Sequence, residues 1–270
     1  MKKVLCHALT PVLFIAAYAF GEDLADQVIP RVVLPNGNAL LQAVRDRLPA
    51  EPITLKATLK TVTSVRSGPD EITRVKAEST MDFGADIPHG SYTIFDLKGM
   101  PIEKAVVEWI KGNARFTYFE GPNLVRKQDF VPTQMLKNTP FTWYDLSLSF
   151  LWWPQAKTIA QSQKTIRKVW LVDLEPPVEL RQTYSRVRLQ IDQAETLVRA
   201  ATVFDAQGEK IREIEMKGLQ ELDGIYMFKD MAITSWPGRV KTTIIVKDLL
   251  RGGAATGEPV PPVSPFPRVP

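Results

Sequence analysis

The chain has few of the side chains that carry out nucleophilic or metal chemistry: one cysteine and two histidines among 270 residues. Cys6 and His7 lie in the first 21 residues, a segment with the features of an export signal. His89 lies in the sequence IPHGSY, whose proline and glycine are typical of a turn that leads into a strand. After export, a Ser-His-Asp or Cys-His site would depend on His89 alone. We interpret His89 as an exposed turn residue and expect no catalytic site.

Paired carboxylates are the other arrangement with catalytic potential. Glu213 and Glu215 alternate along a predicted strand with Lys217, so the three side chains point to one side of it. A glycosidase pair needs one acid in apolar surroundings, whereas this pattern is typical of a solvated face. The sequence also has no cluster of metal ligands, no phosphate-binding glycine loop and no G-x-S-x-G motif. We therefore expect no metal, no cofactor and no enzymatic activity.

The most distinctive group of side chains is aromatic. The segment 138–155, NTPFTWYDLSLSFLWWPQ, places five large aromatic residues within 11 positions. Asp145 is predicted to cap a short helix, which would set Leu146, Phe150 and Trp153 along one side. Two interpretations remain open: the helix packs permanently on a sheet as core, or it is a lid over a cavity for acyl chains. The candidate lipid-binding or lid residues are Trp143, Tyr144, Leu146, Phe150, Trp152, Trp153, Met227 and Met231.

The amino terminus has the three parts of a secretory signal peptide. Two lysines precede an apolar run over residues 12–20, and the alanines at 17 and 19 form an A-x-A pattern. The run is shorter than the roughly 20 residues that span a bilayer, which favours a cleaved signal over an anchor. We predict a signal peptide at residues 1–21, which removes the cysteine, and a periplasmic location for the rest of the chain.

Composition and charge limit the class of the exported part. Hydrophobic residues make up 44% and charged residues 24% of the chain, which are ordinary values for a globular protein. The formal net charge of +4 falls to +2 when Lys2 and Lys3 are subtracted, and this near balance argues against a nucleic-acid partner. Residues 251–270 are rich in proline and glycine and predict a disordered tail. One domain over residues 22–250, a monomer, is the expected organisation.

One helix and a series of strands are predicted between these ends. Asn36 or Asn38 caps the helical segment 39–48, and Pro49 ends it. After Pro52, segments rich in Val, Ile, Thr and aromatic residues alternate with turn signals. The predicted strands cover residues 53–66, 71–83, 91–97, 102–111, 114–120, 165–174, 184–192, 196–204, 210–219, 224–234 and 240–249.

The strand pattern predicts how the sheet is built. Short links between successive strands indicate an antiparallel meander. In the segment 184–192, Val187, Leu189 and Ile191 alternate with polar residues, so one face of that strand is buried. Apolar residues on both faces of the segment 224–234 indicate a strand near the centre. About ten long strands tend to curl and create a concave apolar surface.

The order and spacing of several short motifs resemble a known family. The segments are TPFTWYDLSLSFLWWP, the stretch from YSRVRLQID to YMFKDMAI, and GRVKTTIIVKDL. They are similar to the LolA-like superfamily of outer-membrane lipoprotein-sorting proteins, which includes LolA-like and LolB-like members. The matching motifs are Tyr-Asp-Leu at 144–146, the strand start at 184–187, the hairpin at 204–208 and Asp-Gly at 223–224. The resemblance covers residues 91–249.

The resemblance implies a fold and a task. The fold is mainly β: an open antiparallel half-barrel with helices covering its concave face. The task is that of a periplasmic carrier that shields the acyl chains of a lipid or lipoprotein on the way to the outer membrane. Its partners would be those acyl chains and a membrane transporter or outer-membrane receptor. A lipid sensor or a protein-binding scaffold that uses the same half-barrel without transport remains the alternative.

Overall fold

Strands make up most of the chain that the computed structural model describes, which comprises residues 33–64, 69–110, 112–137, 139–164, 167–222, 225–238 and 240–252. The predicted signal peptide and residues 253–270 of the predicted tail lie outside the described residues. So do the predicted turn at 223–224 and half of the turn at 67–70. Within the described ranges, no helix is both long and apolar enough to cross a membrane.

The strands form one antiparallel sheet in the order β6-β5-β4-β3-β2-β1-β13-β12-β11-β10-β9-β8-β7. Their bounds are β1 Ile53–Thr63, β2 Glu71–Asp82, β3 His89–Phe95, β4 Pro101–Ile110, β5 Asn113–Glu120, β6 Val125–Lys127, β7 Gln155–Lys164, β8 Arg167–Glu175, β9 Tyr184–Asp192, β10 Val198–Asp205, β11 Lys210–Leu222, β12 Ile225–Ser235 and β13 Lys241–Arg251. The last strand thus extends to the first residue of the segment assigned to the tail.

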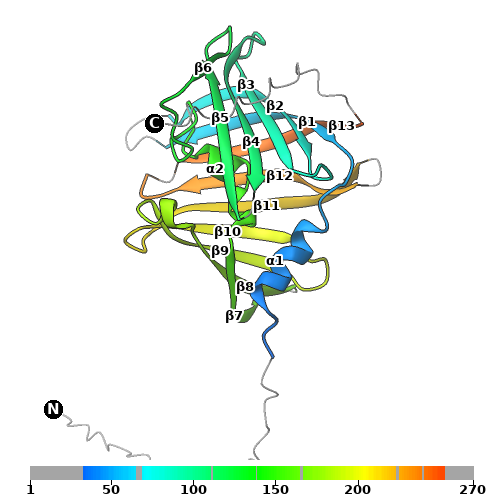
Figure 1. Cartoon of the computed structure of the whole chain (residues 1–270). Coiled ribbons are helices and arrows are strands. Elements are labelled where there is room, and N and C mark those ends of the chain that lie inside the picture. Colours follow the sequence, from blue (N-terminus) through cyan, green and yellow to red (C-terminus); the bar gives the residue numbers. More distant parts are fainter. Residues whose placement is uncertain are drawn as a thin grey trace, which may run out of the picture. The chain divides into compact units, whose positions relative to one another are not determined.

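Two meanders share this sheet. β1 to β6 and β7 to β13 each follow chain order, and they join where β1 pairs with β13, for example through Leu59 opposite Ile244. β6 and β7 lie at the two edges and are not paired with each other in the described residues, so the sheet is open. Figure 1 shows its strong twist: β4 and β5 run upright in the view, whereas β10 to β12 run across it. The predicted mainly β fold with an open antiparallel sheet is confirmed.

Two strands were absent from the sequence prediction. β6 has three exposed residues, and β7, with the sequence QAKTIAQSQK, lacks the regular alternation of large apolar and polar side chains. Both lie at an edge of the sheet and pair with a neighbouring strand on one side only. A regular pattern of apolar residues is therefore less strongly required in these strands. β12 lies next to β13 in the middle of the order, as its two apolar faces predicted.

The helices are short. They are α1 Gly37–Arg45, α2 Trp143–Leu146 and the 3-10 helices η1 Ser149–Trp152 and η2 Val178–Leu180. α1 begins two residues earlier and ends three residues earlier than predicted. Asn36 is its cap, because its side chain accepts a hydrogen bond from the backbone N–H of Ala39 at 3.0 Å. Asn38 instead accepts from the N–H of Ala156 at the start of β7, at 2.8 Å.

Alternating side chains of the strands form the core. Val187, Leu189 and Ile191 of β9 are buried, whereas the polar residues between them are partly exposed, as predicted. Ile214 and Ile233 face each other across β11 and β12 and are fully buried. α1 contributes Leu41 and Val44 to the same core. The aromatic segment contributes most of the largest buried rings, so it belongs to the hydrophobic core as well as to the site described next.

Candidate functional site

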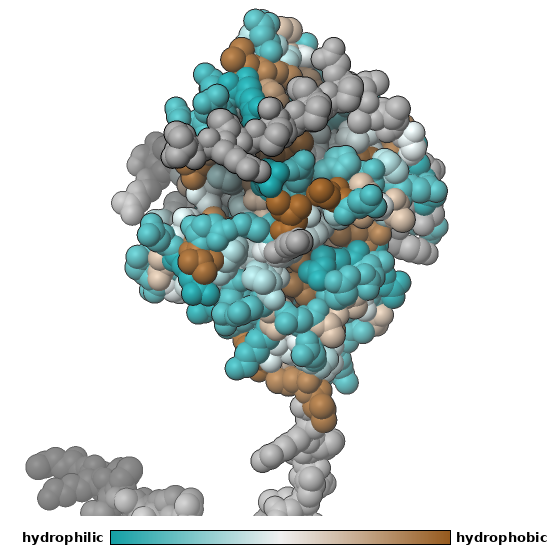
Figure 2. Space-filling view, in the orientation of Figure 1, coloured by the Kyte–Doolittle hydropathy of each residue, from teal (hydrophilic) through white to brown (hydrophobic). Residues whose placement is uncertain are grey.

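An apolar cavity of about 290 Å³ is lined by one face of the sheet, by the end of α1 and the residues just after it, and by the 146–152 segment. This is near the lower end of the volumes that bind small molecules, roughly 300 to 1,000 Å³. Its strand wall consists of Ile53, Leu55, Ala57, Leu59, Ala77, Glu78, Ser79, Met81, Tyr92, Ile94, Val198, Met216, Phe228, Asp230, Met231, Ile244, Val246 and Leu249, and Phe83 directly follows β2. The remaining wall residues are Val44, Arg47, Leu48, Pro49, Leu146, Ser147, Leu148, Leu151, Trp152 and Leu197. In Figure 2, hydrophobic residues also reach the surface between hydrophilic ones in the middle of the visible face.

Three aromatic rings are stacked at the part of the wall where the sheet meets η1. The rings of Trp109 and Trp152 are 4.3 Å apart between centroids and nearly parallel, at 11°. Phe83 stacks on Trp109 at 5.4 Å and on Trp152 at 6.0 Å. The indole N–H of Trp109 donates to Ser149 Oγ at 3.0 Å, which ties η1 to β4. Trp152 and Phe83 line the cavity, whereas Trp109 is not one of its wall residues.

The local sequence explains why the aromatic segment is not one continuous helix. Thr142 is the cap of α2, and the Asp145 side chain accepts from the Thr142 backbone N–H at 2.8 Å in a reciprocal capping box. The prediction that Asp145 is itself the cap was therefore wrong. Leu148 has a left-handed backbone, with φ of 50°, which ends the turn before η1 begins. The break separates Leu146 from Phe150 and Trp153, which the prediction had placed along one helix.

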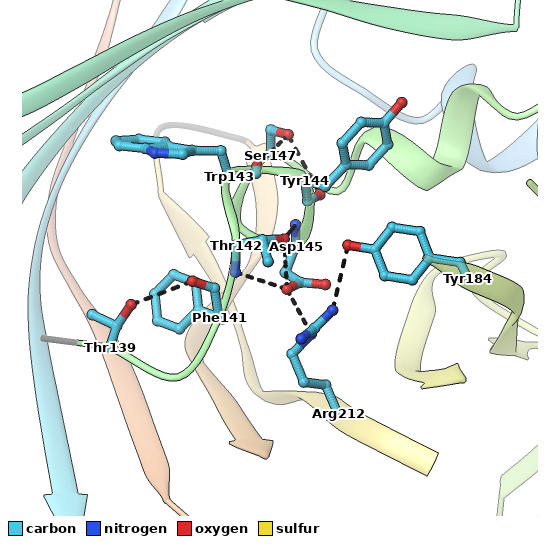
Figure 3. Close-up of polar contacts among 9 residues, drawn as sticks. All are labelled: Thr139, Phe141, Thr142, Trp143, Tyr144, Asp145, Ser147, Tyr184 and Arg212. Carbon is cyan, nitrogen blue, oxygen red and sulfur yellow. Dashed lines mark hydrogen bonds and ion pairs between the residues drawn. The ribbon is translucent and has the colours of Figure 1, made fainter. Parts of the chain in front are cut away.

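A buried ion pair holds α2 against the sheet (Figure 3). Arg212 of β11 contacts the carboxylate of Asp145, with 2.8 Å between Nε and Oδ2. Asp145 is 2% exposed and Arg212 is 5% exposed. The guanidinium also donates to the hydroxyl of Tyr184 at 3.3 Å, and burial raises the pKa of that tyrosine. Because both charges are shielded from water, this pair fixes one end of the 142–153 segment firmly in place.

The structure divides the candidate residues from the sequence into two sets. Leu146, Trp152 and Met231 line the cavity. Trp143, Tyr144, Phe150 and Trp153 are not among its wall residues and are buried in the surrounding core. Met227 lies in β12, but its side chain is outside the described residues. The segment thus packs mainly as core and also contributes residues to a cavity wall.

Most of the cavity wall was not anticipated from the sequence. Leu55, Ala57 and Leu59 of β1 lie opposite Leu249, Val246 and Ile244 of β13, which follow nearly 200 residues later. The alternation within each strand signals a buried face. It does not indicate which buried positions border a cavity and which are closed by packing.

A few polar groups interrupt the apolar wall. Tyr92 of β3 and Ser79 of β2 both line it, and burial raises the pKa of Tyr92. Asp230 of β12 has a buried Oδ1 without a hydrogen-bond partner among the described residues. Arg47, just after α1, adds an exposed cation. Such isolated polar groups in an apolar wall are what orients a ligand in a binding site.

The residues considered for catalysis lie elsewhere. His89 is exposed at the first position of β3, and its Nδ1 lies 3.1 Å from the Ile87 carbonyl oxygen. Glu213 and Glu215 are in separate ion pairs, with Lys210 at 2.7 Å and Lys217 at 3.1 Å. This is the solvated face that the alternation predicted. The described residues contain no group of three or more His, Cys, Asp or Glu side chains placed to hold a metal.

Comparison with known proteins places the chain in a family. A family model described as "-like: Uncharacterized protein" matches residues 105–251, more than half of the chain. The chain belongs to this family. No curated protein matches it significantly.

Solved structures support the fold. A DUF1329 family protein from Desulfovibrio piger superposes with a TM-score of 0.68 at 12% identity, covering 80% of this chain and 91% of that one. A putative outer membrane lipoprotein-sorting protein domain from Vibrio parahaemolyticus gives 0.68 at 13% identity, covering 83% and 94%. A LolA superfamily protein from Nitrosomonas europaea gives 0.60 at 10% identity, covering 80% and 93%. The predicted LolA-like fold is therefore confirmed. At these low sequence identities, the similarity shows the fold alone.

Proposed function

We propose that this protein is a periplasmic carrier that binds the acyl chains of a lipid or lipoprotein in the cavity and shields them during transport toward the outer membrane. The observation that carries the proposal is the cavity itself, whose wall is almost entirely aliphatic and aromatic. Each methylene removed from water contributes about 0.8 kcal/mol, so even a partly inserted acyl chain would gain several kcal/mol without any specific polar contact. The periplasmic location rests on the predicted signal peptide and on the LolA-like fold.

In this proposal, α1 and the 142–153 segment cover the concave face of the half-barrel, and the second of them is a lid. Leu146, Leu148, Leu151 and Trp152 contribute to the cavity wall from that segment. Such a lid has two alternative states: the arrangement described above, which leaves the cavity open, and a second one in which the side chains of the lid occupy the cavity. The buried pair between Asp145 and Arg212 keeps α2 attached, and the Trp109 hydrogen bond holds Ser149 of η1. Movement is therefore expected mainly in the side chains of Leu148, Leu151 and Trp152, which line the cavity.

The test uses the purified full chain, extracted mildly and examined by native mass spectrometry, followed by transfer of a fluorescent phospholipid between vesicles. A carrier retains lipid and accelerates transfer. Trp152→Ala should reduce both, whereas Trp236→Ala, a partly exposed tryptophan outside the cavity wall, should leave both unchanged. Lipid retention without transfer would favour a lipid sensor. A protein that neither retains lipid nor takes it up from vesicles would contradict the proposal.

A further inference from the structure

Tyr92 is a closely packed residue of the cavity wall. It lies on β3 and is only 6% exposed. Its ring lies over Gly90, because a Cβ atom built there would be 3.2 Å from Cε2 of Tyr92 and 3.2 Å from the ring of Trp109. The absence of a side chain at Gly90 is what makes room for the tyrosine ring. Close packing against Gly90 and Trp109 thus places the Tyr92 ring at the cavity wall.

The Tyr92 hydroxyl differs from the other tyrosine hydroxyls that the structure describes. Those of Tyr118, Tyr144 and Tyr184 bond to Glu103 at 2.9 Å, Asn113 at 3.0 Å and Arg212 at 3.3 Å, respectively. For Tyr92, no side-chain hydrogen bond to a described residue exists, although the residue is as deeply buried as the others. Burial raises its pKa, so the hydroxyl keeps its proton and is a donor at neutral pH.

A second hydroxyl lies beside it. Ser79 of β2 is directly opposite Tyr92 in the register of the two strands, and both line the cavity. Ser79 also has no side-chain hydrogen bond to another described residue. The wall has two acidic residues. Asp230 lies on β12, and β2, β1 and β13 separate it from β3. Glu78 directly precedes Ser79 on β2, and successive side chains of a strand point to opposite faces. Two neutral donors, Tyr92 and Ser79, are thus neighbours on the same face of the sheet.

We propose that Tyr92, with Ser79 beside it, donates hydrogen bonds to the carbonyl oxygen of an acyl ester or amide, so that the cavity binds the linkage region of an acylated ligand as well as its hydrocarbon. The inference rests on the proposed function, since it assigns the chemical class of the ligand. Two neutral hydroxyl donors can bind a neutral carbonyl oxygen at a small desolvation cost. The desolvation of a charged carboxylate at this apolar wall would cost far more free energy. A site with an unpaired donor also rejects an analogue that lacks the acceptor.

The test compares two ligands with the same dibrominated 18-carbon chain, of which only the first carries an ester group: methyl 9,10-dibromostearate and 9,10-dibromooctadecane. Bromine quenches tryptophan fluorescence, and Trp152 lies on the cavity wall. The unmodified protein should bind the ester about 2- to 12-fold more tightly than the hydrocarbon. Tyr92→Phe should abolish this preference by weakening ester binding alone, and Ser79→Ala should reduce it. The free dibromostearic acid, as a third ligand, should bind less tightly than the ester at neutral pH.

Tyr118→Phe is the matched control. Tyr118 and Tyr92 both lie opposite Ala105 of β4, from the two sides, but Tyr118 is not a wall residue. Its replacement should leave the ester preference intact. The inference is overturned if Tyr92→Phe keeps the preference, or if the unmodified protein binds both ligands equally. Absence of quenching by any of the ligands would instead contradict the acyl-chain cavity and hence the proposed function.

Discussion

Replacement of Asp145 by asparagine tests how the aromatic segment is held. The substitution keeps the size of the side chain and an oxygen that can accept from the Thr142 N–H, but it removes the charge that faces Arg212. Arg212 is 5% exposed, and Asp145 is its only ion-pair partner among the described residues. A buried guanidinium without a counter-charge is costly, and breaking a buried pair from one side typically destabilises a protein by about 3 to 5 kcal/mol.

Urea denaturation followed by tryptophan fluorescence measures this loss directly. We expect a free energy of unfolding about 3 to 5 kcal/mol lower for Asp145→Asn, and a Tm lower by about 6 to 20 °C for a domain of this size. The control is Glu215→Gln, also affecting an ion pair of β11, in which the side chains of Glu215 and Lys217 are 38% and 47% exposed. That change should cost less than about 1 kcal/mol.

A double-mutant cycle separates the ion pair from the capping role of Asp145. Arg212→Gln combined with Asp145→Asn should be much less destabilising than the sum of the single changes, with a coupling of about 2 kcal/mol or more. A loss below about 1 kcal/mol for Asp145→Asn, or additive effects in the cycle, would show that the pair does not anchor α2. The reasoning about a fixed lid base would then be wrong.

Three further outcomes follow from the packing. Trp153 is 2% exposed, so Trp153→Ala should lower the free energy of unfolding by about 3 to 5 kcal/mol. Trp152→Ala should mainly weaken lipid binding. Equal losses of stability in the two variants would contradict the assignment of Trp153 to the core and of Trp152 to the cavity wall. Burial raises the pKa of Glu103. The unmodified protein should therefore gain stability relative to Glu103→Gln as pH falls from 7 toward about 4.3. If urea denaturation gives the same difference in free energy of unfolding between the two proteins at every pH, this prediction is wrong. Gly37→Ala should lower Tm despite better helix propensity, because its Cβ would lie 2.4 Å from the Ala156 carbonyl oxygen; an unchanged or higher Tm would refute the clash.

The sign of the Glu103 prediction follows from proton binding. Glu103 is 1% exposed, and its carboxylate accepts hydrogen bonds from the hydroxyl of Tyr118 and the backbone N–H of Lys137. Desolvation outweighs these bonds, so the folded state binds a proton at a higher pH than the unfolded chain does. Between the two pKa values the folded state holds more protons, and stability therefore falls as pH rises through that window.

The sequence by itself determined the class of the sheet and most of its strands, but not the edge strands β6 and β7. Strands such as β9 repeat apolar residues at every second position, and this local period is enough to predict both the strand and its buried face. Turns such as the one at Asp205 to Gly208 depend on the residues within them, since the Asp205 side chain bonds the N–H groups of Gln207 and Glu209. The LolA-like motifs added the expectation of an open half-barrel.

Only the tertiary structure decided which buried residues border the cavity. The pairing of β1 with β13 brings together residues nearly 200 positions apart, and no local pattern encodes it. Likewise, the local sequence predicts that Asp145 is a helix cap, but the structure shows that Asp145 forms an ion pair with Arg212, on a strand 67 positions later. Trp152 and Trp153 are adjacent and chemically identical, and only the break at Leu148 and the packing around it direct one to the cavity and the other to the core. Local sequence specifies period and turns, whereas a cavity depends on where distant elements leave space unfilled.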